Sequence, residues 1–234
     1  MTVAETDMTA FRWGKPLVVA IDGPSGSGKS SVSRETARRL HAAYLDTGAM
    51  YRAVTWHCLE TGVDLADAGA VENACEEVDL AISTSPDHQR VAVGGRDVTE
   101  AIREPEISKA VSAVATTLGA RAELIRRQKQ IIADSGRRIV AEGRDITTVV
   151  APDAEVRILL TASEESRLRR RGLQLGGTQS AEALQEQVLA RDAKDSAVVN
   201  FHEAADGVFT VDSSDLDFEQ TVDAVLSVIR RATR

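Results

Sequence analysis

The sequence from residue 23 to residue 30 reads Gly23-Pro24-Ser25-Gly26-Ser27-Gly28-Lys29-Ser30, a complete G-x-x-x-x-G-K-S phosphate-binding loop. An apolar run, Leu17-Val18-Val19-Ala20-Ile21, precedes it, and a helix-compatible stretch follows from Ser31 to His41. Because the glycines let consecutive backbone N–H groups turn inward, such a loop holds a polyphosphate at the start of a helix. A glycine-rich surface turn would lack this strand–loop–helix context. The chain is therefore predicted to bind ATP or another nucleoside triphosphate through residues 23 to 31.

Two side chains of this loop carry the expected chemistry. Lys29 is placed to reach the β- and γ-phosphates, and the Ser30 hydroxyl is placed to ligate Mg²⁺. We therefore expect Lys29 to be catalytic and Ser30 to be the metal ligand.

Apolar strand-like runs alternate with helical patterns along the chain, which favours an α/β fold with a parallel sheet between helices. Strands are expected at 17–22, 138–142, 155–161 and 207–212. Helices are expected at 28–41, 48–61, 164–175, 181–193 and 218–231, and one long helix at 108–134. Short alternating segments between residues 79 and 98 predict a small antiparallel hairpin or three-stranded sheet inserted into this core.

Composition restricts the class of protein. The 234 residues are enough for one large domain, and the net charge of −8 argues against nucleic acid as the main partner. Cys58 and Cys75 have no metal-ligand or disulfide-framework spacing, and the four histidines are scattered. The first 15 residues lack a signal-peptide pattern, and no apolar run has the length of a membrane span. A cytoplasmic location without membrane association is therefore expected.

Four further clusters have the side chains that phosphoryl transfer needs, arginines and carboxylates near strand ends. They are Asp46-Thr47-Gly48-Ala49-Met50-Tyr51-Arg52, Glu142-Gly143-Arg144-Asp145, Arg167-Leu168-Arg169-Arg170-Arg171 and Arg191-Asp192-Ala193-Lys194-Asp195. In the first, Thr47 is expected to cap a helix. The third is expected to be a lid that closes over a triphosphate, because its arginines repel one another without anions. Helix capping, structural ion pairs and solvated charged faces are the alternative interpretations of these clusters.

Taken together, these motifs and Ala110-Val111-Ser112-Ala113-Val114-Ala115 make the chain resemble the bacterial cytidylate (CMP/dCMP) kinases, a family of nucleoside monophosphate kinases. The resemblance covers about residues 17 to 230. It implies a single P-loop kinase domain with a three-layer fold, a core at 17–61, 106–162 and 179–234, and a monophosphate-binding insert at 62–105. It also implies a short lid at 163–178, an N-terminal extension at 1–16, and a monomer that uses Mg²⁺ with ATP, CMP and dCMP.

The resemblance also implies roles for individual residues. Thr47, Arg52 and Arg144 would hold the acceptor phosphate beside Asp46 and Tyr51, and Ser112, Arg121 and Asp145 would recognise cytosine. Arg191 and Asp195 would hold the ribose. Arg167, Arg170 and Arg171 would neutralise the transferring phosphoryl group. The residues expected to be catalytic are Lys29, Arg144, Asp145, Arg167 and Arg171.

The chain departs from the family pattern at two positions. Val198 stands where the family has an arginine, and Thr147 stands where it has a glycine, so Thr147 is expected to reshape the turn after Asp145. A P-loop kinase for another small acceptor, a GTP-dependent switch protein and an inactive nucleotide-binding homologue remain as alternatives. The sequence has no Asn-Lys-x-Asp guanine signature, which counts against the switch protein.

Overall fold

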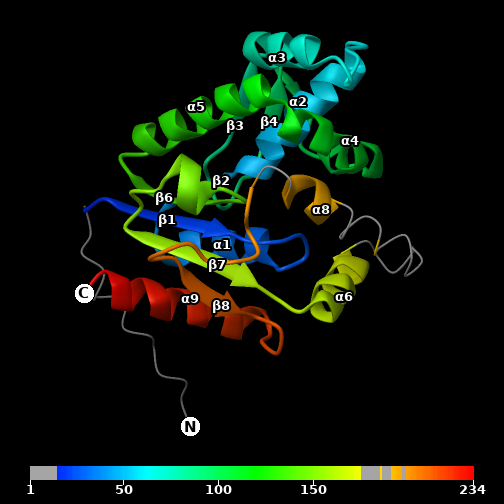
Figure 1. Ribbon diagram of the computed structural model, residues 1–234. Helices are drawn as coiled ribbons and strands as arrows, with labels where there is room; N and C mark the ends of the chain where they lie inside the picture. Colours follow the sequence, from blue (N-terminus) through cyan, green and yellow to red (C-terminus); the bar gives the residue numbers. More distant parts are fainter. Residues whose placement is uncertain (1–14, 175–184, 186–190, 197–198) are drawn as a thin grey trace.

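The computed structural model describes residues 15–174, 185, 191–196 and 199–234 (Figure 1). Several predictions fall outside these residues: most of the expected helix at 181–193, the end of the expected lid, most of the N-terminal extension, and the departure at Val198. The side chain of Arg191 is also outside them.

Five parallel strands form the central sheet, in the order β2-β6-β1-β7-β8 (Figure 1). Their bounds are β1 Leu17–Asp22, β2 Ala43–Asp46, β6 Arg138–Gly143, β7 Val156–Thr161 and β8 Phe209–Asp212. All six residues of β1 are buried, as expected for a central strand that is covered on both faces. The predicted α/β class with a parallel sheet is confirmed.

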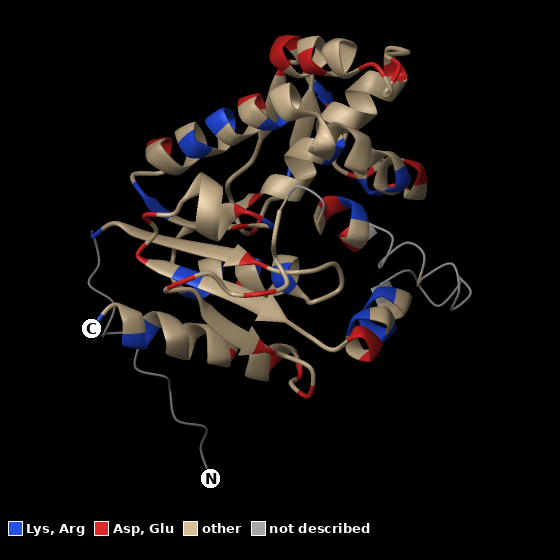
Figure 2. Ribbon diagram, in the orientation of Figure 1, with Lys and Arg blue, Asp and Glu red and all other residues tan. Residues whose placement is uncertain are grey.

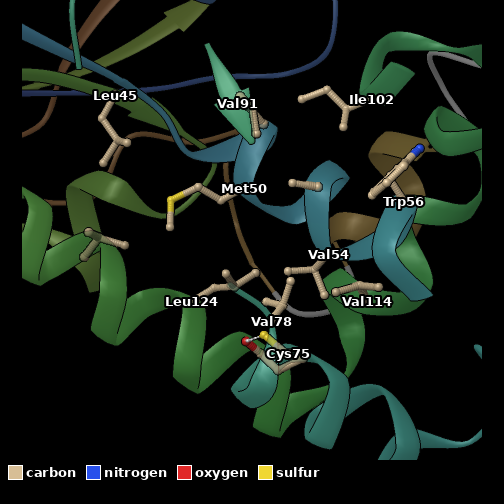
Figure 3. Packing of buried hydrophobic residues seen from close by; sticks show 14 of the residues in the cluster. Leu45, Met50, Val54, Trp56, Cys75, Val78, Val91, Ile102, Val114 and Leu124 are labelled. Carbon is tan, nitrogen blue, oxygen red and sulfur yellow. Dashed lines mark hydrogen bonds between the residues drawn. The ribbon is translucent and has the colours of Figure 1, made fainter. Parts of the chain in front are cut away.

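Two hydrophobic clusters cover the two faces of the sheet. Along β1, Val18 and Ala20 belong to one cluster, and Val19 and Ile21 belong to the other, because successive strand side chains point to opposite faces. The first cluster includes residues of α2 (Thr47–Glu60) and α5 (Leu118–Asp134); Figure 3 shows Met50, Val54 and Leu124 within it. The second packs α1 (Lys29–Arg39) and α9 (Phe218–Ala232) against the sheet.

The segment between α2 and α4 contains the predicted small antiparallel sheet, with the strand order β3-β4-β5. Its elements are α3 (Ala68–Glu77), β3 (Leu80–Ile82), β4 (Val91–Val93), β5 (Arg96–Asp97) and the 3₁₀ turn η2 (Ala101–Arg103). Helix α3 was missed by the sequence analysis. Asp67 caps its first turn by accepting hydrogen bonds from the backbone N–H groups of Gly69 and Ala70.

The prediction of one helix over 108–134 is wrong, because the chain forms α4 (Pro105–Thr116) and α5 with an extended residue, Thr117, between them. The Thr116 hydroxyl donates to the carbonyl of Ser112, and the Thr117 hydroxyl donates to that of Ala113. Such side-chain hydrogen bonds compete with helix continuation.

The remaining elements follow the core strands. They are the π-helical turn η3 (Ile146–Val150) after β6, α6 (Glu164–Gln174) after β7, and α8 (Arg191–Ser196). In the part of the chain that the structure describes, no helix is long and apolar enough to cross a bilayer.

Candidate active site

A cavity of about 960 Å³ opens beyond the carboxyl ends of β1, β2 and β6. Its walls come from the phosphate loop, the start of α2, the turn after β6, one face of α4, α6 and the loop before α9. This volume lies at the upper end of the range for ligand pockets, roughly 300–1,000 Å³. Residues of charged type lie near these strand ends and along α6 (Figure 2). The position is the one where open α/β sheets bind their ligands.

The phosphate loop joins β1 to α1, and residues Ser25 to Ser31 line the cavity. Gly28 precedes α1 with a φ of 87°, a conformation that favours glycine. At Gly26 a Cβ atom would lie 2.7 Å from the carbonyl oxygen of Arg167, so only glycine lets α6 pack this closely. The Lys29 ammonium donates to the carbonyl of Pro24 at 3.4 Å. The loop therefore presents its helix N-terminus and one lysine to the cavity.

Ser30 and Glu142 form an oxygen pair beside the loop. The Ser30 hydroxyl donates to Oε1 of Glu142 at 2.6 Å, and the Tyr44 hydroxyl donates to the same atom at 3.3 Å. Burial raises the pKa of Glu142 to about 7, and the nearby Asp46 carboxylate adds to the rise, whereas Lys29 opposes it. A hydroxyl and buried carboxylates are ligands that suit Mg²⁺, which usually takes few protein ligands together with phosphates and water.

No group of three or more His, Cys, Asp or Glu side chains that could hold a metal on its own occurs among the described residues.

The start of α2 corrects one expectation. Asp46, and not Thr47, caps this helix: its carboxylate accepts from the backbone N–H of Ala49 at 2.8 Å. Thr47 is the first helical residue, and its hydroxyl donates to the carbonyl of Glu142 at 2.8 Å. Burial alone would raise the pKa of Asp46, but Arg52, paired with it at 3.0 Å, holds that pKa below its usual value. The first turns of α2 thus place Arg52 among the residues that line the cavity.

Two more arginines reach this part of the cavity. Arg103 comes from η2 in the inserted segment, and Arg171 comes from α6. Burial lowers the pKa of Arg171, and the charge of Arg52 lowers it further, so these two cations lie near each other. Arg52, Arg103 and Arg171 together create a positively charged wall from three separate elements.

Arg121 of α5 and Asp145, directly before η3, form a buried ion pair that lines the cavity. Their side chains are 14% and 6% exposed, respectively. Burial raises the pKa of Asp145, and Arg121 only partly offsets this. The Tyr51 hydroxyl is buried close to the pair, and burial together with Asp145 raises its pKa. The predicted base-recognition residues Arg121 and Asp145 are therefore brought together.

Arg144 lies in a different network. Its guanidinium pairs with Asp192 at 2.8 Å and with Asp195 at 2.9 Å, and it stacks 4.3 Å from the centre of the Phe201 ring. Ser112, predicted to contact the base, is not among the residues that line the cavity, and its hydroxyl donates to Asp195 at 3.1 Å. Helix α8 thus brings two carboxylates to an arginine expected to hold phosphate.

The arginines of α6 divide into two groups. Arg167 is buried, and its guanidinium donates to the carbonyl of Ser25 at 3.0 Å and to Asp192 at 2.5 Å. Arg170 lines the cavity but donates to the carbonyls of Ser27, Ser213 and Leu216. Arg169 and Arg171 also line the cavity. In this structure Arg167 and Arg170 therefore tie α6 to the phosphate loop instead of repelling one another.

Three residues of this region received no role of their own from the sequence. Glu142 is the penultimate residue of β6 beside the phosphate loop, and its position as an acid at the carboxyl end of a buried strand was the available signal. Asp192 accepts from Arg144, from Arg167 and from the backbone N–H of Ser25 at 3.1 Å. Arg103 carried no sequence signal of its own, because its role depends on how the inserted segment folds.

A phosphate loop, a hydroxyl–carboxylate pair beside it and a cavity wall of arginines are the features expected of a P-loop kinase. A sequence profile of the family described as cytidylate kinase matches residues 19–231. The chain belongs to the cytidylate kinase family.

Individual relatives agree with this assignment. The chain is 49% identical to the cytidylate kinase of Cutibacterium acnes, over 92% of this chain and 96% of that protein. It is 47% identical to the cytidylate kinase of Nocardia farcinica, over 92% and 94% of the two chains. Among solved structures, TT1252 from Thermus thermophilus is 19% identical, with a TM-score of 0.46 over 91% of this chain and 97% of that one, too low to bear on the fold.

Proposed function

We propose that this protein transfers the γ-phosphoryl group of ATP to CMP and dCMP, giving ADP and CDP or dCDP. The observation that carries the proposal is one cavity that joins a phosphate loop to the buried Arg121–Asp145 pair. The first feature suits a nucleoside triphosphate, and the second suits a base with a donor beside acceptors.

For the donor, the backbone N–H groups of the loop and the Lys29 ammonium stabilise the charge that develops on the phosphates. Ser30 and Glu142 would hold Mg²⁺, which would supply positive charge to neutralise the phosphates. Arg171 and Arg169 face the same space from α6. They would complete the charge stabilisation around the transferring group.

For the acceptor, Arg52 would hold the monophosphate at the start of α2, beside Thr47 and Asp46. Arg103 lines the same wall and supports this assignment. Arg144 would join them only by exchanging its carboxylate partners on α8 for phosphate oxygens. Asp195 and Arg191 are proposed for the ribose.

For the base, cytosine presents a 4-amino donor beside the acceptors N3 and O2. The Asp145 carboxylate can accept from the amino group, and Arg121 can donate to the acceptor edge. Tyr51 packs beside this pair. Uracil has O4 in place of the amino group, which would face the lone pairs of the carboxylate.

A coupled assay of ADP release with CMP, dCMP, UMP, AMP and shikimate as acceptors tests the proposal. CMP and dCMP should give the highest kcat/KM, and EDTA should stop the reaction. Equal efficiency with UMP, or a preference for AMP or shikimate, would favour a P-loop kinase for another acceptor. Nucleotide binding without transfer to any acceptor would favour an inactive homologue.

The proposal also covers the oligomeric state, the partners and the cellular location of the enzyme. We infer a monomer without nucleic-acid or membrane partners. The net charge of −8 supports the absence of a nucleic-acid partner. A cytoplasmic location is supported by Cys58 and Cys75, which are both buried and unpaired.

A further inference from the structure

The turn after β6 has an unusual arrangement of helix-capping groups. Asp145 occupies the N-cap position of η3, but its side chain makes no capping hydrogen bond. An aspartate at this position ordinarily accepts a hydrogen bond from a backbone N–H group of the first turn. Here the Asp145 carboxylate is paired with Arg121 and lines the cavity instead.

Asp22, the last residue of β1, supplies the missing cap from the strand next to β6. Its carboxylate accepts from the backbone N–H of Ile146 at 2.8 Å and from that of Thr147 at 2.8 Å. The N–H of Thr147, the second residue of η3, is one that an N-cap side chain ordinarily satisfies, and the N–H of Ile146 is another group of the first turn without a partner inside the helix. The same strand leads directly into the phosphate loop, so the cap also connects the donor and acceptor sides of the cavity.

Thr147 adds a third hydrogen bond to this arrangement. Its side-chain hydroxyl donates to Oδ2 of Asp22 at 2.6 Å, and both residues are buried. Burial raises the pKa of Asp22 to about 6, the charge of Asp145 adds to the rise, and the Thr147 hydrogen bonds oppose it. The hydroxyl therefore favours the ionised carboxylate that can accept from all three donors. The glycine of the family pattern could not make this bond.

We propose that Thr147 is a positioning residue of the acceptor site, acting through Asp22. The two side chains satisfy the first turn of η3 and thereby keep the Asp145 carboxylate turned toward Arg121 and the acceptor base. The proposal rests on the proposed function, because it assigns Thr147 a part in selecting a cytosine nucleotide.

The test uses Thr147→Val, which has nearly the same shape but no hydroxyl, and Thr147→Ser, which restores it. Thr148→Val is the matched control, since Thr148 is the next residue of η3 and is exposed. Thr147→Gly removes the hydroxyl without placing a methyl group beside the carboxylate, and it replaces Thr147→Val if that variant does not fold. Each protein is assayed for KM and kcat with CMP, UMP and ATP, and for amide exchange at Ile146 and Thr147.

Loss of the hydroxyl should make the two amides exchange about 10- to 150-fold faster, the change expected from losing one hydrogen bond to a charged group. KM for CMP should rise several-fold and the preference for CMP over UMP should fall, while KM for ATP stays within about twofold. Thr147→Ser and Thr148→Val should behave like the wild type.

Unchanged amide exchange and an unchanged CMP preference in Thr147→Val would overturn the inference. So would equal losses toward CMP and ATP, which would indicate a role in stability alone. Failure of the wild type to phosphorylate CMP would instead overturn the proposed function. In that case the amide exchange would still decide whether Thr147 fixes the turn.

Discussion

At the scale of single residues, buried charge is what the two sides of the cavity have in common. Glu142 is buried next to a hydroxyl and a lysine, whereas Asp145, three positions later, is buried against an arginine. Burial raises the pKa of both carboxyls. Their partners differ, and so do the ligands that each can receive: a hard cation beside Glu142 and a hydrogen-bond donor beside Asp145.

Replacement of Lys29 by alanine tests the donor side. The ammonium stabilises charge on the phosphate oxygens, and removal of such a preorganised group costs roughly 3–4 kcal/mol, or about 10²–10³ in rate. We expect kcat to fall by that factor while the far-UV circular dichroism spectrum stays unchanged. A variant that keeps more than half of the wild-type kcat would refute the assignment of the loop.

Replacement of Asp145 by alanine tests the acceptor side. The variant should lose far more kcat/KM with CMP than with UMP, because only the cytosine amino group is left without its acceptor. A polar site built for one pattern can reject another by as much as about 10⁴–10⁵, and partial access of water reduces that factor. Parallel losses with the two nucleotides would mean that Asp145 does not contact the base.

At the scale of secondary-structure elements, a side chain of α5 caps the C-terminal end of α3. Helix α3 has no basic residue in its last turn. Arg127 of α5 supplies the charge by donating to the carbonyls of Cys75, Glu76 and Val78, each at 3.0 Å. Since the last carbonyls of a helix have no partners within it, this arginine connects the inserted segment to the core.

Arg127→Met should therefore lower the free energy of unfolding by about 1.5–3 kcal/mol, the range for hydrogen bonds to charged groups. Arg126→Met is the matched control: Arg126 also pairs with Glu123, but its side chain is 65% exposed. The control should change stability by no more than about 0.5 kcal/mol. Urea unfolding of both variants, with amide exchange in α3, measures the difference; equal effects would contradict the capping role.

Glu123, which pairs with both arginines, makes the stability of this contact between α5 and α3 depend on pH. Hydrogen bonds from Arg126, followed by those from Arg127, lower the pKa of Glu123 to about 2, against an unfolded value of 4.5. A carboxyl with a lowered folded pKa stabilises the protein above its unfolded pKa, and the effect is lost as pH falls through the folded value. Glu123→Gln should therefore be less stable than the wild type above about pH 5, with the difference vanishing near pH 2. A difference that is constant across this range would exclude an ionic origin.

At the scale of the whole molecule, the charged wall of the cavity comes from three separate parts of the chain. Arg103 belongs to the inserted segment, Arg52 to the core helix α2, and Arg171 to α6. One carboxylate, Asp46, pairs with Arg52 at 3.0 Å and also interacts with Arg103, and nucleotide phosphates would bring further negative charge to this group of cations. Closure around both nucleotides would also exclude the water that would otherwise hydrolyse ATP.

We therefore expect amide exchange to slow in residues 62–105 and in α6 when ADP and CMP are both bound. Each nucleotide alone should give a smaller effect, and residues 225–232 of α9, which pack on the opposite face of the sheet from α2 and do not line the cavity, should be unaffected. Unchanged exchange in both segments with both nucleotides present would contradict a closing motion.

Much of this fold follows from local sequence alone. Glycine positions identify the phosphate loop, and apolar runs identify the α/β class and the four strands expected at 17–22, 138–142, 155–161 and 207–212. Both signals act within a few residues. The predictions from sequence were wrong where local signals compete with one another or with packing. Thr117 breaks the expected long helix because threonine hydroxyls compete with the helix, and Asp46 displaces Thr47 as the cap because its carboxylate reaches the N–H of Ala49.

Local sequence signals are enough to identify a phosphate loop in a parallel α/β sheet and the clusters of arginine and carboxylate that could serve it. Which of these charges meet depends on the fold. Asp192 joins Ser25 across 167 positions, Asp22 joins Thr147 across 125, and Arg167 reaches the loop across 142. The physical reason is that a buried charge is stable only beside a partner. That partner is chosen by how the helices pack on the sheet, not by spacing along the chain.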